Sequence, residues 1–321
     1  MQELLQRVPA HRPLPSTGRF LQQIGPTPLV SVRLSPDAPA IWCKLEFLNP
    51  SGSTKDRIAR YMLEKAWRQG LLGPGGEVIE ASSGSTSIAM ALACAQMGLH
   101  FTAVMPEGVT EERILTIKAY GAKVILVPKA DGIGGAIARA ETESRQRGAF
   151  YPKQFENPDN AEAHRVWTGQ EILSQIPCGC IQAVVSGVGT GGTIVGLYQA
   201  FAESGCPARP YVARPVNGTS LSEVECCSFS SRVPGVVDGL SKLFNEANLP
   251  GLEVLNVADG VAIETARALI AKGFPVGPSS GLNFAAALIA SRQLGPDAQV
   301  VTVFPDRMER YFSTDLFRPR S

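Results

Sequence analysis

The sequence lacks an excess of charge of either sign, and it lacks any long hydrophobic run. Its 30 lysine and arginine residues nearly balance 29 aspartate and glutamate residues, which gives a formal net charge of +1. Proteins whose main partner is nucleic acid usually carry a basic excess, so this composition argues against that class of partner. No apolar stretch approaches the roughly 18–20 residues that span a bilayer, and residues 1–15 contain no apolar signal region. We therefore expect a cytoplasmic protein without a membrane partner.

Cysteine patterns typical of metal sites are also missing. The seven cysteines are odd in number and scattered, and no two of them form a CxxC pair, which argues against a structural zinc site. Cys178 with Cys180, and Cys226 with Cys227, are spaced closely enough for redox chemistry. Reduced thiols are the commoner outcome in a cytosolic protein, so we expect reduced cysteines and no metal.

The hydrophobic pattern indicates an α/β protein. A chain of 321 residues, 44% of them hydrophobic, can bury the core of one large domain or of two modest ones. Short β-rich runs alternate with longer helical runs, a pattern typical of parallel sheets covered by helices. Strands are predicted at 41–47, 77–81, 101–105, 123–127, 181–186, 210–213 and 300–304. Helices are predicted at 56–69, 86–97, 111–120, 133–147, 161–175, 192–201, 262–272 and 282–294.

Two domains are expected, each with a mostly parallel sheet flanked by helices. Residues 50–149 form the smaller α/β domain, and residues 1–49 together with 150–321 form the larger one. Ligands of such folds bind at the carboxyl ends of strands. The segments that directly follow predicted strands are therefore the first places to search for a site.

The first such segment leads to a lysine. Residues 49–57 read Asn-Pro-Ser-Gly-Ser-Thr-Lys-Asp-Arg, and Lys55 stands where the next helix begins. The positive end of the helix dipole disfavours an ammonium group there, and a lysine with a lowered pKa is suited to Schiff-base chemistry. A single lysine in this position is more often an ordinary surface residue, so Lys55 alone does not identify a site.

The second segment is rich in hydroxyl groups. Residues 80–87 read Glu-Ala-Ser-Ser-Gly-Ser-Thr-Ser, between a predicted strand and a predicted helix. Capping a helix takes one hydroxyl residue, whereas this segment has five. Free backbone N–H groups and hydroxyls at a helix start form a cradle for an anion, which favours a bound carboxylate over simple capping.

The third segment is a glycine loop. Residues 186–193 read Ser-Gly-Val-Gly-Thr-Gly-Gly-Thr and precede a predicted helix, which makes a good phosphate site. Gly187, Gly189 and Gly192 also fit the G-x-G-x-x-G dinucleotide pattern. That pattern wants an acidic residue about 20 positions later, where this chain has Arg214. Arg214 could bind the 2′-phosphate of NADP, so an NADP-binding oxidoreductase remains an alternative at this point.

The fourth segment is Gly277-Pro-Ser-Ser-Gly281, again before a predicted helix. The hydroxyl of Ser279 can pair with a ring nitrogen, although a serine there is more often a helix cap. The same residues match the G-x-S-x-G pattern of serine hydrolases. In those enzymes the histidine follows the serine, whereas all three histidines of this chain precede it, which argues against that class.

In this order, the four segments resemble those of the cysteine synthase and cystathionine β-synthase family, the tryptophan-synthase-β-like or fold type II pyridoxal-phosphate (PLP) enzymes. The resemblance extends from Ile24 to Thr314. Its further anchors are Ile24-Gly-Pro-Thr-Pro-Leu29, Val104-Met-Pro-Glu107, Gln154-Phe-Glu-Asn-Pro158, Thr168-Gly-Gln-Glu-Ile172, Gly235-Val-Val-Asp-Gly239 and Glu309-Arg-Tyr-Phe-Ser-Thr314.

The resemblance implies a role for each segment, with pyridoxal 5′-phosphate as the cofactor, bound by the larger domain. Lys55 forms the internal aldimine and later moves the Cα proton, and Ser279 pairs with the pyridine nitrogen. The phosphate is held by Gly189, Thr190, Gly191, Gly192 and Thr193. The substrate carboxylate is received by Ser82, Ser83, Thr86 and Gln154. His164 matches a structural position.

Three departures from the family pattern bear on the substrate. Ser85 replaces the asparagine that contacts the cofactor's ring hydroxyl, and Arg214 replaces an acidic residue. The usual glycine-rich segment reads Gly235-Val-Val-Asp238-Gly239. Asp238 could orient a second, amine-bearing substrate, or it could be a solvated loop residue, so Gly235 and Asp238 are candidate substrate-binding residues.

The implied reaction is β-replacement on an O-activated L-serine through an α-aminoacrylate, as in cysteine synthase. The activated serine would be O-acetylserine or O-phosphoserine, and the nucleophile would be sulfide or another group. A ring nitrogen paired with serine makes a weaker electron sink than one paired with aspartate, which favours loss of a β-substituent. The alternatives are β-elimination as in a cysteine desulfhydrase, cystathionine β-synthase-like replacement, the NADP-binding oxidoreductase, and an inactive binding scaffold. A homodimer acting on an amino-acid substrate is expected.

Overall fold

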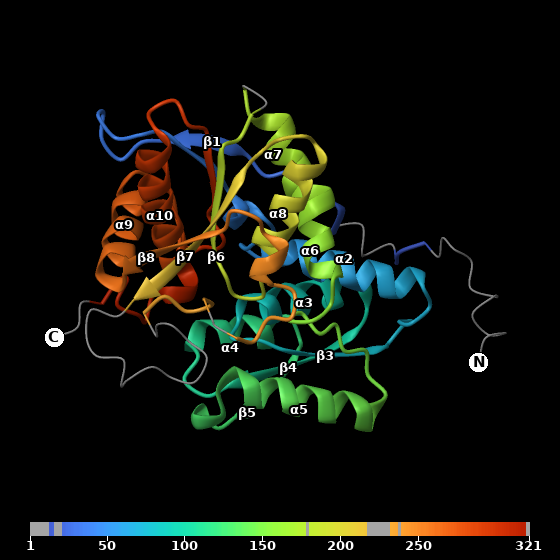
Figure 1. The fold of residues 1–321 in the computed structure, drawn as a ribbon. Coiled ribbons are helices and arrows are strands. Elements are labelled where there is room, and N and C mark those ends of the chain that lie inside the picture. Colours follow the sequence, from blue (N-terminus) through green and yellow to red (C-terminus); the bar gives the residue numbers. More distant parts are fainter. Residues whose placement is uncertain (1–12, 16–20, 178–179, 217–231, 237–238, 319–321) are drawn as a thin grey trace. The chain divides into compact units, whose positions relative to one another are not determined.

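A computed structural model describes residues 13–15, 21–177, 180–216, 232–236 and 239–318 (Figure 1). Contacts divide the chain into two compact units. The first comprises Lys55–Gln154 with the described part of Met1–Ile24, and the second comprises Gly25–Thr54 with Phe155–Ser321. The boundaries expected from the sequence, 50 and 149, fall close to these. The described part of residues 1–24 clusters with the first unit, whereas residues 1–49 were predicted to belong to the larger domain.

The first unit is built on a three-stranded parallel sheet. Its strands are β3 (Glu77–Ala81), β4 (His100–Pro106) and β5 (Lys123–Val127), in that order. Figure 1 shows α5 on one face and α3 and α4 on the other. The helices are α2 (Lys55–Arg68), α3 (Ser85–Met97), α4 (Glu111–Ala119) and α5 (Gly132–Arg147), with a short 3-10 turn at Lys129–Asp131. Each strand is followed by a helix that covers it, which is why this segment reads as alternating strands and helices.

The second unit is built on a six-stranded sheet in the order β1-β2-β9-β6-β7-β8. Only β1 is antiparallel to its neighbour. The strands are β1 (Leu29–Val32), β2 (Ile41–Lys44), β6 (Ala183–Gly187), β7 (Arg209–Val216), β8 (Glu253–Ala258) and β9 (Val300–Val303). Buried aliphatic residues form one core between the sheet and its C-terminal helices and a second core on the side of α8.

Helices cover both faces of this sheet. They are α6 (Asp159–Ala163), α7 (Gln170–Gln175), α8 (Gly192–Glu203), α9 (Asp259–Ala271) and α10 (Pro278–Leu294). Figure 1 places α9 and α10 on one face and α6, α7 and α8 on the other. Short 3-10 turns occur at Glu46–Leu48, Glu246–Asn248 and Met308–Tyr311. The expected α/β class, with mostly parallel sheets flanked by helices, is confirmed.

The chain is helical throughout the predicted range 161–175, but it is not a regular α-helix. The structure has α6, a π-helical turn over His164–Gly169, and then α7. Close packing against α8 accompanies the change, because a Cβ added to Gly169 would lie 2.4 Å from the Cβ of Ala200. Turns of this kind are rare in proteins, and those that occur often lie at functional sites. Strands β1 and β8 were not predicted.

Among the described residues, no helix is long and apolar enough to cross a membrane. Nor does that part of the chain contain a group of three or more histidine, cysteine, aspartate or glutamate side chains that could hold a metal ion. Cys43, Cys94, Cys180 and Cys206 are free thiols. Cys178, Cys226 and Cys227 lie outside the described residues.

Candidate active site

Lys55 is the first residue of α2 and is half-buried. The segment before it belongs to the second unit and is tied to the C-terminal part of that unit. Thr54 donates its backbone N–H to the carbonyl of Pro305 at 2.8 Å, and Arg310 donates to the carbonyl of Gly52 at 2.8 Å. These long-range contacts hold residues 51–54 within the second unit, and α2 begins at the next residue.

The serine-rich segment forms the N-terminus of α3. Gly84 is the N-cap with φ 147° and offers no side chain to cap the helix. The hydroxyl of Ser82 does that work instead, because it accepts the backbone N–H groups of Gly84 and Ser87, each at 3.1 Å. A side chain at Gly84 would have to displace Arg113, since an added Cβ would lie 2.2 Å from the Cδ of Arg113. Ser82 is thus built into the loop, whereas Ser83 and Ser85 are only half-buried.

Gln154 joins this segment from a distant part of the chain. The Thr86 hydroxyl donates to Gln154 Oε1 at 2.6 Å, and Gln154 Nε2 donates to the carbonyl of Ala81 at 2.6 Å. Both Thr86 and Gln154 are buried. The first unit therefore brings together three of the four residues expected to receive a substrate carboxylate: Ser82, Thr86 and Gln154.

Sequence reasoning assigned no role to Glu80, which the structure places beneath this cradle. The side chain is fully buried, and burial raises the pKa of its carboxyl group to about 8. It accepts the backbone N–H of Ala81 at 2.9 Å and that of Gln154 at 3.1 Å. The sequence did contain a signal for Glu80, because it is an acidic residue within the apolar part of the predicted strand 77–81. A carboxyl group that is buried in a strand requires hydrogen-bond partners.

In the second unit, the glycine loop lies between β6 and α8. Gly191 is the N-cap of α8 with φ 81°, and no side chain caps the helix. Close neighbours exclude side chains along the loop. An added Cβ would lie 2.3 Å from the carbonyl oxygen of Gly235 at Gly189, and 1.9 Å from Oδ1 of Asn160 at Gly192. The glycines are therefore needed for packing as well as for access to the backbone N–H groups.

Hydroxyl groups complete this loop. Thr190 Oγ1 accepts from Asn160 Nδ2 at 2.9 Å, and the carbonyl of Thr190 accepts from the Ser241 hydroxyl at 2.6 Å. Thr193 Oγ1 lies 3.3 Å from Nε2 of the buried His164. An uncapped helix start with two anchored threonine hydroxyls and closely approachable backbone is the donor set that a phosphate group requires. The residues present therefore fit the phosphate of PLP.

The start of α10 carries Ser279, which is half-buried. An added Cβ at Gly277 would lie 2.5 Å from Asp306 Oδ1, and one at Gly281 would lie 2.0 Å from the carbonyl oxygen of Ala262. Close packing thus accounts for both glycines of the G-x-S-x-G match. From the next turn of α10, Asn283 accepts the backbone N–H of Gly187 at 2.8 Å, which ties α10 to the glycine loop.

The remaining predicted residues have different outcomes. Gly235 is exposed, with φ 90°, and its carbonyl packs against Gly189. Asp238 lies outside the described residues. Arg214 is half-buried within β7.

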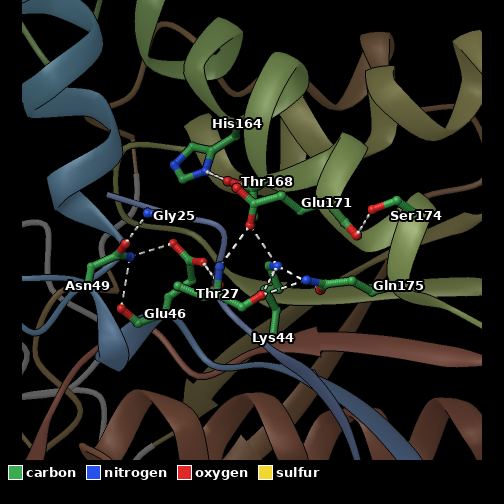
Figure 2. Close-up of polar contacts among 10 residues, drawn as sticks. All are labelled: Gly25, Thr27, Lys44, Glu46, Asn49, His164, Thr168, Glu171, Ser174 and Gln175. Atoms are coloured by element: carbon green, nitrogen blue, oxygen red, sulfur yellow. Dashed lines mark hydrogen bonds and ion pairs between the residues drawn. The ribbon is translucent and has the colours of Figure 1, made fainter. Parts of the chain in front are cut away.

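A buried polar network, not anticipated from the sequence, supports the same unit beside His164 (Figure 2). The Nζ of Lys44 lies 2.7 Å from Glu171 Oε2, and the Lys44 side chain has no exposed surface. Glu171 also accepts the backbone N–H of Thr27 at 3.1 Å. In Figure 2 the network joins the chain around Thr27 and strand β2 to helix α7, which directly follows the π-helical turn that carries His164 and Thr168.

Comparison with known proteins identifies the family of this chain. Residues 20–306 match the family model described as "Pyridoxal-phosphate dependent enzyme". A cysteine synthase of Staphylococcus aureus is 37% identical over 306 residues, which cover 92% of this chain and 96% of the relative. The structure of an O-ureido-L-serine synthase is similar with a TM-score of 0.84, 32% identity, and coverage of 96% of this chain and 98% of that one.

A hydrogen sulfide-producing enzyme of Fusobacterium nucleatum is also similar, with a TM-score of 0.83, 35% identity, and coverage of 95% of this chain and 92% of that one. The family match leaves the NADP-binding oxidoreductase without support. Since the family model covers most of the sequence, and the relatives match it nearly from end to end, this chain belongs to the pyridoxal-phosphate-dependent enzymes, and its cofactor is PLP.

Proposed function

We propose that this enzyme catalyses β-replacement on an O-activated L-serine, with O-acetyl-L-serine and sulfide as the first pair to test and L-cysteine as the product. The observation that carries the proposal is the likeness to a cysteine synthase over 92% of the chain. The likeness to an O-ureido-L-serine synthase supports the serine skeleton and leaves the nucleophile open to other classes.

Lys55 is proposed to hold the cofactor. When bound, PLP supplies an electron sink that allows a β-substituent of the amino acid to leave. The Nζ of Lys55 would bind the aldehyde carbon of the cofactor. The uncharged Nζ of Lys55, once free of the cofactor, would take the Cα proton of the substrate. Lys55 is the first residue of a 14-residue helix and directly follows Thr54, whose backbone N–H donates to the carbonyl of Pro305.

The second unit is proposed to bind the phosphate and the pyridine nitrogen of the cofactor, and Ser85 of the first unit to bind its ring hydroxyl. The phosphate would be bound by Gly189, Thr190, Gly191, Gly192 and Thr193. The N–H groups at the start of α8 and the anchored hydroxyls support this assignment. Ser279 would pair with the pyridine nitrogen and Ser85 with the ring hydroxyl. A serine at the ring nitrogen does not require a protonated ring, and this property favours loss of a β-substituent over transamination.

The amino-acid carboxylate is proposed to bind at the start of α3, to Ser82, Ser83, Thr86 and Gln154. The bonds that join Thr86 to Gln154 and Gln154 to Ala81 support this role, because they fix the amide of Gln154. Gly235 and Asp238 are proposed to contact the nucleophile. An acidic side chain at 238 would suit a nucleophile that carries an amine.

The direct test is cysteine formation by the purified holoenzyme from O-acetyl-L-serine and sulfide, with O-phospho-L-serine as the comparison substrate. We expect cysteine production that Lys55→Ala abolishes and that Lys65→Ala, a change further along the same helix, leaves intact. A holoenzyme that forms cysteine from neither substrate would overturn cysteine synthesis. Displacement of the acetyl group by another nucleophile would keep β-replacement and change the product.

A second candidate is β-elimination, which the likeness to the hydrogen sulfide-producing enzyme favours. Such an enzyme would convert L-cysteine and water into sulfide, pyruvate and ammonia. Measurement of sulfide and pyruvate formed from L-cysteine alone separates the two candidates. Faster sulfide release from cysteine than cysteine formation from O-acetyl-L-serine would make elimination the main activity.

We also propose that the enzyme is a cytoplasmic homodimer and that its two units are separate domains. The free thiols at Cys43, Cys94, Cys180 and Cys206 support a reducing compartment, and the contact pattern supports two domains. Light scattering during size-exclusion chromatography tests the dimer, and cell fractionation tests the location. Limited proteolysis that releases a fragment close to residues 55–154 would support the domain boundary.

A further inference from the structure

The carboxyl group of Glu80 is buried in the first unit and accepts hydrogen bonds from backbone groups of that unit. It has no exposed surface, and its two oxygens accept different backbone N–H groups. Oε1 accepts from Ala81 at 2.9 Å, and Oε2 accepts from Gln154 at 3.1 Å. A buried carboxyl group that accepts two backbone N–H groups constrains the backbone that supplies them.

The residue before Gln154 has an unusual conformation. Lys153 has φ 56°, and among the described residues it is the only non-glycine residue with positive φ. The left-handed conformation costs a residue with a Cβ roughly 1–2 kcal/mol. The next N–H group along the chain, that of Gln154, donates to Glu80 at 3.1 Å. Glu80 therefore holds the chain directly after this strained residue.

The consequence reaches the side chain of Gln154. Its backbone is held by Glu80, its Oε1 accepts from Thr86, and its Nε2 donates to Ala81. Ala81 is itself bonded to Glu80. Glu80 thus closes a ring of hydrogen bonds that fixes both the amide of Gln154 and the strand that leads into the serine-rich loop.

We propose that Glu80 is a positioning residue for substrate binding, one that fixes the Gln154 amide where it receives the carboxylate of the amino acid. This inference rests on the substrate role given to Gln154 in the proposed function.

The test compares Glu80→Gln with Glu77→Gln on the same strand, whose side chain is exposed, and with Gln154→Ala. An amide in place of the carboxyl group can accept one N–H, but its NH₂ group opposes the other. We expect Glu80→Gln to keep bound PLP, to raise KM for O-acetyl-L-serine about tenfold, and to change kcat less than about threefold. Glu77→Gln should match the wild type, and Gln154→Ala should raise KM at least as much as Glu80→Gln.

The outcomes separate this inference from the proposed function. If Gln154→Ala raises KM and Glu80→Gln does not, the positioning role is wrong and the substrate site stands. If Gln154→Ala has no effect, the substrate role of Gln154 fails first. Should Glu80→Gln not fold, Glu80→Gln with Lys153→Gly is compared with Lys153→Gly alone, because glycine adopts positive φ without strain. Equal KM values for that pair would overturn the inference.

Discussion

The buried ion pair in Figure 2 gives a sharp prediction about stability. Glu171→Gln keeps the shape of the side chain and removes the charge that faces Lys44 Nζ at 2.7 Å. Lys44 is fully buried and cannot turn to water. Removal of one partner of a buried pair costs about 3–5 kcal/mol. We expect the lower end, about 3 kcal/mol, because the Glu171 side chain is 17% exposed.

The matched control is Glu162→Gln. Glu162 pairs with Arg165 at 2.6 Å, but both side chains are about one-third exposed. Arg165 also keeps a second partner, Glu203. Exposed pairs contribute about 0–1 kcal/mol, so this control has the closer contact and the smaller expected loss. A comparison of the stability losses of Glu171→Gln and Glu162→Gln therefore separates the effect of burial from that of the distance between the charged atoms.

The assay is urea unfolding of the holoenzymes, followed by far-ultraviolet circular dichroism, with the midpoint and slope compared among variants. The midpoint of Glu171→Gln should fall clearly below that of the wild type, and Glu162→Gln should stay close to it. The double change Lys44→Met with Glu171→Leu should recover part of the loss, because no charge then remains buried. Equal midpoints for Glu171→Gln and Glu162→Gln would refute the reasoning.

Three further predictions follow from single features. Gly192→Ala should weaken PLP binding at least tenfold in an equilibrium titration, because its Cβ would lie 1.9 Å from Asn160 Oδ1; unchanged binding would contradict the loop geometry. Burial raises the pKa of Glu80 from 4.5 to about 8. The folded state therefore holds that proton more tightly than the unfolded chain does. The stability of the wild type relative to Glu80→Gln should thus be greatest below pH 4.5, fall by an amount on the order of several kcal/mol up to about pH 8, and then level off; a difference in unfolding free energy that stays constant with pH would be the contrary result. Burial raises the pKa of the Cys94 thiol, while Cys180 is exposed, so mass-spectrometric mapping after brief alkylation of the native enzyme should find Cys180 modified and Cys94 intact.

The sequence was most informative where local pattern and fold agree. The strand at Glu77–Ala81 was predicted at its observed bounds, as was the strand at Lys123–Val127, since each is a short apolar run between turn residues. The glycine loop and the serine-rich segment were also found as segments that follow strands. Their position reflects a general property of parallel sheets, in which the loops after strands gather at one edge.

What the sequence could not predict depends on contacts between distant residues. The π-helical turn at His164–Gly169 accompanies close packing against α8, and no helical periodicity reports such packing. The distant partner of Glu80, the backbone N–H of Gln154, lies 74 positions later in the chain. In addition, the residue type at 153 does not indicate a positive φ, which is typical of glycine and not of lysine. Strand β1 was not predicted, although β9, which has the same length, was.

The proposed function depends most on Lys55 as the residue that holds the cofactor. The most direct measurement reduces the holoenzyme with borohydride, digests it, and locates the pyridoxyl phosphate group by peptide mass spectrometry. The account predicts that the group is attached to Lys55 and that the Lys55→Ala enzyme carries none. Attachment to another lysine, or an unmodified Lys55 in an active enzyme, would contradict it.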